Sequence, residues 1–114
     1  MNRLKSKMFI LIILMLFFNN ISLNNSVTGA EIINVKIDGS GDYTSIQNAV
    51  NAASEGSTIM IYNGTYSENL IINKSLIIKG EDKINTFINA DRGIAFDIKS
   101  NDIEISGLTI LNAD

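Results

Sequence analysis

The stretch Ser57–Gly80, STIMIYNGTYSENLIINKSLIIKG, consists of three short apolar segments separated by polar turns. The segments cover residues 58–62, 70–72 and 76–78, and no helical pattern lies between them. Short runs rich in Ile and bounded by Asn, Gly and Ser are typical of β-strands. The connections are too brief for the crossover helices of an ordinary parallel sheet. The stretch therefore predicts short strands joined by turns. Their apolar faces must be buried by something other than crossover helices.

A weak internal repeat indicates how these strands bury their apolar faces. One fixed shift along the chain superposes Ile71 on Ile98, Leu76 on Ile103, Ile78 on Ile105, and Gly80 on Gly107. In a solenoid, each coil stacks its inward side chains on the equivalent side chains of the coil before. The repeat therefore predicts an all-β protein, a parallel β-helix of about three coils.

The remaining strands are expected at residues 31–37, 86–89, 95–99, 103–105 and 108–111. The side chains expected to face the core are Ile59, Ile61, Leu70, Ile72, Leu76, Ile78, Phe87, Phe96, Ile98, Ile103, Ile105, Leu108 and Ile110. In the segment 70–72 only one face can point inward. The fixed shift favours Ile71 there, so the choice between Ile71 and the pair Leu70 and Ile72 stays open.

One helix is expected, at residues 45–53. Residues 44–47, TSIQ, match a capping box in which the Thr44 hydroxyl accepts a hydrogen bond from the Gln47 amide. Apolar residues then recur at helical spacing, and Gly56 follows as a stop: Ile46, Ala49, Val50 and Ala53. Because so short a helix is marginal alone, we expect it to cap the amino end of the strand stack.

The first thirty residues have the pattern of a signal peptide. Three basic residues precede the apolar run Met8–Phe18, which is shorter than the roughly 20 residues of a membrane span. The small residues 28–30 suit a signal peptidase, and we expect cleavage after Ala30. The alternative is that the segment is not cleaved and anchors the protein in the membrane. We therefore divide the chain into a signal peptide (1–30), a strand with a capping helix (31–56) and the coils (57–114).

Composition excludes several kinds of chemistry. The chain has no Cys and no His, so disulfides, Ser/His/Asp or Cys/His catalysis and thiolate or imidazole metal sites are excluded within it. Nine basic and twelve acidic residues give a net charge of −3. Three of the basic residues precede Met8, so the rest carries six against twelve, a net −6. Such a charge does not favour nucleic acid as a partner.

Two stretches resemble a known group of proteins. Asp38–Ala53, DGSGDYTSIQNAVNAA, followed by Ser57–Gly80, resembles the amino-terminal cap and first coils of right-handed parallel β-helix proteins, especially pectinesterase-like and NosD-like extracellular proteins. The resemblance covers Val35–Asp114 and implies a right-handed coil. In the pectinesterase-like enzymes the catalytic residues lie on later coils, so none is assigned here. The NosD-like name implies a copper-linked role, but Met60 is the only sulfur donor after the leader, and we expect no copper site.

Few residues stand out as candidate sites. Tyr62 and Glu68 are possible ligand contacts, and Asn63 and Asn73 open N-x-S/T sequons for N-glycosylation. Three carboxylates could gather on one lateral face and act on glycosides: Glu68, Asp97 and Glu104. The preferred interpretation is that they are solvated surface residues. Likewise, the aspartates in 38–42, DGSGD, could approach calcium but more simply form a turn. No catalytic residue, metal or cofactor is assigned.

The sequence therefore predicts an exported or cell-surface β-helix with a binding or structural role, adhesin-like and facing carbohydrate or cell wall. One alternative is the amino-terminal part of a pectinesterase-like or pectate-lyase-like enzyme that lacks its catalytic coils, and a lower one is a periplasmic maturation factor. We expect membrane contact only through an uncleaved leader. Because nothing in the sequence after Leu108–Leu111 covers the last coil, we expect an open carboxyl end that either continues in a longer protein or self-associates.

Overall fold

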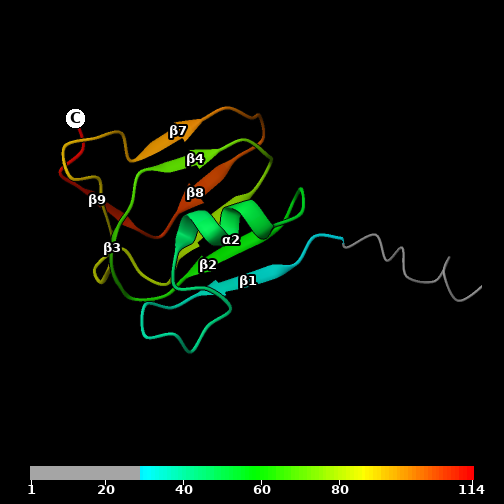
Figure 1. The fold of residues 1–114 in the computed structure, drawn as a ribbon, viewed down its shortest axis with the longest axis horizontal. Helices are drawn as coiled ribbons and strands as arrows, with labels where there is room; N and C mark the ends of the chain where they lie inside the picture. The colour runs from blue at the N-terminus through cyan, green and yellow to red at the C-terminus, as the bar shows by residue number, and fades with distance from the viewer. Residues whose placement is uncertain (1–28) are drawn as a thin grey trace, which may run out of the picture.

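The strands wind into a parallel β-solenoid of about four turns with one short helix (Figure 1). The computed structural model describes residues 29–114, so the predicted leader lies outside the described residues apart from its last two positions. The strands are β1 (Ile32–Val35), β2 (Thr58–Ile61), β3 (Gly64–Ser67), β4 (Leu70–Ile72), β5 (Ile77–Gly80), β6 (Thr86–Asn89), β7 (Phe96–Ile98), β8 (Glu104–Ser106) and β9 (Thr109–Leu111).

These strands form three sheets, and every pairing is parallel. The sheet orders are β1-β2-β5-β8, β3-β6-β9 and β4-β7, so each complete turn places one strand in each sheet. The predicted parallel β-helix is confirmed. The prediction of about three coils falls short because β1 also stacks under β2, with Ile33 opposite Ile59 and Val35 opposite Ile61.

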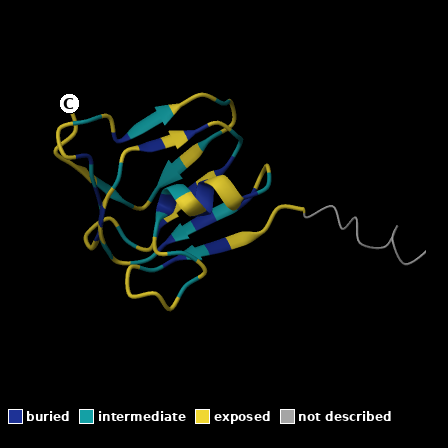
Figure 2. Ribbon diagram, viewed as in Figure 1, coloured by how far each residue is buried: buried dark blue, intermediate teal, exposed yellow. Residues whose placement is uncertain are grey.

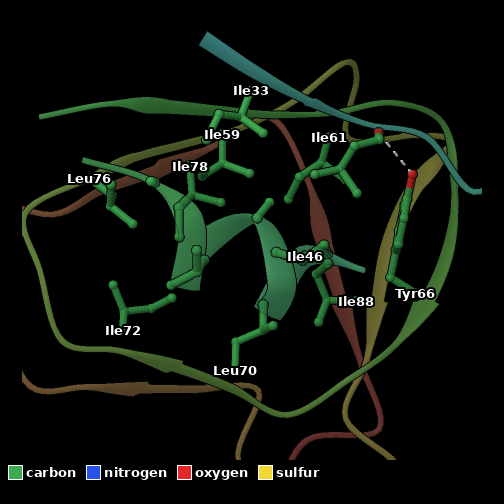
Figure 3. Packing of buried hydrophobic residues seen from close by; sticks show 14 of the residues in the cluster. Ile33, Ile46, Ile59, Ile61, Tyr66, Leu70, Ile72, Leu76, Ile78 and Ile88 are labelled. Atoms are coloured by element: carbon green, nitrogen blue, oxygen red, sulfur yellow. Dashed lines mark hydrogen bonds between the residues drawn. The ribbon is translucent and has the colours of Figure 1, made fainter. Parts of the chain in front are cut away.

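Rows of aliphatic side chains fill the interior of the solenoid (Figure 3). Register places Ile33, Ile59, Ile78 and Ile105 in one row that crosses the first sheet. Six of the predicted inward residues are buried: Ile59, Ile61, Leu70, Ile72, Leu76 and Ile78. Each contributes roughly 1.5–3 kcal/mol by leaving water. Stacking between turns is therefore the main source of stability.

One expectation about the inward face was wrong, and the choice that the sequence left open in β4 is decided. In β6 the buried side chains are Thr86 and Ile88, whereas Phe87 lies on the outer face and is half-buried. In β4, Leu70 and Ile72 are buried, and Ile71 is the exposed residue.

The fixed shift favoured the wrong face of β4 because two corners differ in length. The fixed shift holds between β5 and β8, where Ile78 pairs with Ile105, but it is one residue too long for β4 and β7. The corner after β7 contains one residue more than the corner after β4. A single inserted residue at a corner thus changes the face that a repeat assigns to the strand beside it.

The glycines of the repeat mark a close approach between turns. A Cβ added to Gly80 would lie 2.1 Å from the carbonyl oxygen of Gly107, closer than any side chain tolerates. Gly64 begins β3, a strand that lies within one of the polar connections that the sequence predicts to be turns. In a solenoid one sharp corner at Asn63 suffices to carry the chain from one sheet to the next.

The helix α2 (Ile46–Ala52) occupies the place where a third strand of the first turn would lie. It packs against β1, β2 and β4 and buries Ile46, Ala49 and Val50, as its spacing predicts (Figure 1). Its N-cap is Ser45, whose hydroxyl accepts from the Asn48 amide at 3.2 Å. The prediction that Thr44 caps the helix was therefore wrong by one residue.

The last turn is the least covered part of the described chain (Figure 2). Ile98 and Ile110 are 48% and 46% exposed, although register stacks them on the fully buried Ile72 and Ile88. Phe96, Ile103, Ile105 and Leu108 are partly buried against the core. Within residues 29–114 no strand pairs with the outer edges of β7, β8 and β9. Self-association through this surface stays a prediction.

Substitutions in β6 test the direction of its side chains. Ile88→Ala should lower the free energy of unfolding by about 2–5 kcal/mol, because it leaves a cavity in the core. Phe87→Ala should cost less, about 1 kcal/mol, because the ring is already partly in solvent. Urea unfolding of the two purified variants measures both effects. A larger loss for Phe87→Ala would contradict the observed register.

Candidate functional site

A shallow hollow lies beside the corner that joins β2 to β3, and we call it the Tyr62 hollow. Its lining residues are Lys36, Ile37, Asp38, Tyr62, Asn63 and Glu81. Lys36 and Tyr62 directly follow β1 and β2, whose parallel register places them side by side on the outer face. The hollow is thus built by adjacent turns of the solenoid.

Tyr62 is held in place by two contacts. The Lys36 ammonium lies 4.4 Å from the centre of the Tyr62 ring, a cation–π contact worth about 0.5–1 kcal/mol at an exposed site. The Tyr62 hydroxyl donates to Oδ1 of Asn34 at 3.3 Å. The ring is therefore oriented by β1 before any ligand arrives.

Two carboxylates complete the hollow. Asp38 accepts hydrogen bonds from the backbone amide and the hydroxyl of Ser40, at 2.9 and 2.7 Å, and these bonds lower the pKa of the Asp38 carboxyl. Glu81 accepts from the Asn63 backbone amide at 3.0 Å. A ring, an ammonium group and two carboxylates offer the stacking surface, donors and acceptors that a hydroxyl-rich ligand uses.

The acidic turn at residues 38–42 hydrogen-bonds to β1. Asp42 accepts from both the backbone amide and the side-chain amide of Asn34, at 2.7 and 3.2 Å. It thereby covers part of the outer edge of β1, an edge that would otherwise expose unpaired amides. Among residues 29–114, no cluster of three His, Cys, Asp or Glu could hold a metal ion.

Glu68 lies outside the Tyr62 hollow and binds the start of α2. Its carboxylate accepts from the Ser45 hydroxyl at 2.7 Å, the Ile46 amide at 2.8 Å and the Gln47 amide at 3.2 Å. A carboxylate at a helix N-terminus satisfies free amides and complements the positive end of the helix dipole. Ligand contact by Glu68 stays a prediction, whereas its role in holding the helix is visible.

Gln47 attaches the same helix to β4. Its side-chain amide donates to the Ile71 carbonyl at 3.1 Å and accepts from the Ile71 amide at 2.8 Å. These two bonds reproduce the pairing that a neighbouring strand would provide. Sequence reasoning assigned Gln47 to a capping box and missed this contact, because it joins residues far apart in the chain.

The other candidate carboxylates do not gather with Glu68. Asp97 lies on β7 and forms a salt bridge with Lys99 at 3.1 Å, whereas Glu104 lies on β8. The strands β7 and β8 belong to different sheets, and Glu68 lies between β3 and β4. The possibility that these three carboxylates gather on one lateral face is not realised, and solvated acidic residues remain the preferred interpretation for Asp97 and Glu104.

Tyr66, on β3, is a core residue. It is 3% exposed, and its hydroxyl points at the carbonyl oxygens of Tyr62 and Val35, at 2.9 and 3.2 Å (Figure 3). Burial raises the pKa of this hydroxyl above its usual value near 10. Tyr43 also packs partly against the core, which leaves Tyr62 as the tyrosine of the hollow.

A comparison with known proteins finds sequence similarity to a cell surface protein. The chain is 33% identical over 103 residues to a cell surface glycoprotein of the archaeon Methanothermus fervidus, and the match covers 87% of this chain and 17% of that protein. The two are distantly homologous over this segment. No family model and no solved structure matches the chain. The resemblance to pectinesterase-like and NosD-like proteins therefore stays a prediction.

One further observation bears on the membrane. Within residues 29–114, no helix has the length and apolar character needed to cross a bilayer.

The helix-binding role of Glu68 can be tested by substitution. Glu68→Ala should lower the free energy of unfolding by about 1–3 kcal/mol, since three donors at the helix N-terminus lose their acceptor. Glu104→Ala is the matched control: its side chain is exposed, and the effect should stay within about 0.5 kcal/mol. Urea unfolding followed by circular dichroism measures both. Equal stability of the two variants would contradict the role.

Proposed function

We propose that this chain is a structural module of the cell surface. The observation that carries the proposal is the similarity to a segment of a cell surface glycoprotein, which covers 87% of this chain. The predicted signal peptide supports export by an independent route. The fold is also suited to the role, because a solenoid extends by adding coils and keeps its outer faces available.

The position of the predicted cleavage site agrees with this proposal. The Glu31 amide donates to the Ser57 hydroxyl at 3.1 Å, and the Glu31 carbonyl accepts from the Thr58 amide at 2.8 Å. Hydrogen bonding between β1 and β2 thus begins at Glu31. A cut after Ala30 would leave the whole first strand in place.

Surface display can be measured directly. In the producing organism, an antibody raised against the solenoid should detect the protein on intact cells or in the medium. An antibody against a cytoplasmic protein is the control and should detect nothing there. The recovered protein should begin at or near Glu31 by mass spectrometry. Retention inside the cell with an intact Met1 would overturn the proposal.

We further propose that the Tyr62 hollow faces carbohydrate. The support is its composition: an oriented aromatic ring with an ammonium group and carboxylates at its rim. Because carboxylates outnumber the ammonium group there, a neutral polysaccharide fits better than a polyuronide.

Affinity electrophoresis in gels that contain a soluble neutral glucan tests this second proposal. Tyr62→Ala should weaken retardation roughly fivefold, since a stacked ring contributes about 0.5–1.5 kcal/mol. Tyr62→Phe keeps the ring and should remain close to the parent. Ile71→Ala, on an exposed face of another sheet, is the control. Equal retardation of all four proteins, or none, would refute carbohydrate contact at Tyr62.

A further inference from the structure

We propose that Asn73, and not Asn63, is the residue of the folded protein that accepts an N-linked glycan. The inference rests on the proposed surface display, because N-linked glycans are added to exported chains. It concerns which of the two sequons is available once the solenoid has formed. The contacts of the two asparagines differ sharply.

Asn63 is exposed, as Asn73 is, but its side chain bonds to the next turn of the solenoid. Its Oδ1 accepts from the Thr86 hydroxyl at 3.3 Å, and Thr86 is fully buried. Its side chain also lies near enough to the Asp82 carboxylate to affect the pKa of that group. Burial pushes the pKa of Asp82 upward, but hydrogen bonds from Asn85 and Ile84, together with the Asn63 side chain, outweigh it, so the pKa lies below its ordinary value.

Presenting the Asn63 amide to an enzyme therefore disturbs the stack. The side chain must leave both Thr86 and Asp82, and a buried hydroxyl then loses its acceptor. The Asn63 backbone amide, bound to Glu81, holds the same corner. Modification at Asn63 thus requires local opening of the corner between β2 and β3.

Asn73 lies on the exposed turn between β4 and β5. Among the described residues, none hydrogen-bonds its side-chain amide. The turn around it is nevertheless fixed, because the Lys74 ammonium donates to the carbonyl of Ala53 at 2.8 Å and the Ser75 amide donates to Glu55 at 2.7 Å. The Ser75 hydroxyl donates to the Asn101 carbonyl at 2.9 Å in an exposed setting, where water or an enzyme can replace the bond.

The transfer itself needs only the amide and an activated sugar. Nδ2 of Asn73 forms a bond to the anomeric carbon of an oligosaccharide carried on a lipid phosphate. The bond between that carbon and the phosphate oxygen breaks, the lipid phosphate leaves, and the amide loses one proton. No oxidant or reductant takes part.

The choice of sequon matters for the Tyr62 hollow. Asn63 lines that hollow, so a glycan there would occupy it. Asn73 belongs to a different corner of the coil, between β4 and β5. Modification at Asn73 therefore leaves the hollow open to external carbohydrate, in agreement with the proposed function.

The test uses the purified chain as an acceptor in vitro, with an oligosaccharyltransferase that recognises N-x-S/T and a lipid-linked oligosaccharide. Glycopeptide mass spectrometry reads each site in the folded chain and in the chain unfolded by urea, diluted just before transfer. In the folded chain Asn73 should be modified at least about tenfold faster than Asn63. In the unfolded chain the two rates should approach each other.

Sequon variants supply matched controls that keep both asparagines. Ser75→Ala should abolish modification of the folded chain, and Thr65→Ala should leave it unchanged. Equal rates at both sites in the folded chain, or modification of Asn63 alone, would overturn the inference, as would a folded chain that accepts no glycan. Because transfer is measured on purified protein, the result is independent of where the protein lies in the cell.

Discussion

The whole structure depends on the parallel, in-register stacking of apolar side chains from one turn on those of the next. The chain has no Cys, so no covalent link reinforces this stacking. Each inward Ile is buried only because a turn above or below covers it, as Ile59 is covered by Ile33 and Ile78. Stability in such a fold is a sum of contacts between neighbouring turns, and the uncovered last turn has the most exposed core residues.

The amino-terminal turn satisfies the same requirement with a helix. The helix α2 fills the place of a missing strand under β4, and Gln47 supplies the hydrogen bonds that a strand would give. Glu68 binds the amides at the start of this helix from the corner that precedes β4. Gln47 and Glu68 thus join the helix to the edge of the sheet that contains β4. The helix thereby completes the first turn of the solenoid.

The corners of the solenoid carry its candidate functional groups. Strand residues are committed to alternating inward and outward positions, whereas corner residues project at the edge between sheets. Tyr62 and Asn63 lie at one corner and Asn73 at another. The difference between the two sequons arises here, since Asn63 bonds to the next turn through Thr86 and Asn73 does not.

The sequence by itself determined that short Ile-rich segments would stack as parallel strands, and that Ile46, Ala49 and Val50 would form the buried face of a helix. These features follow from local periodicity. Only the tertiary structure decided that Ile88 and not Phe87 points inward, that Ser45 caps the helix, and that Glu68 binds it. The physical reason is that these outcomes depend on corner lengths and on groups from neighbouring turns. A one-residue change at a corner reverses a face, and a carboxylate finds its donors only after the coil has closed.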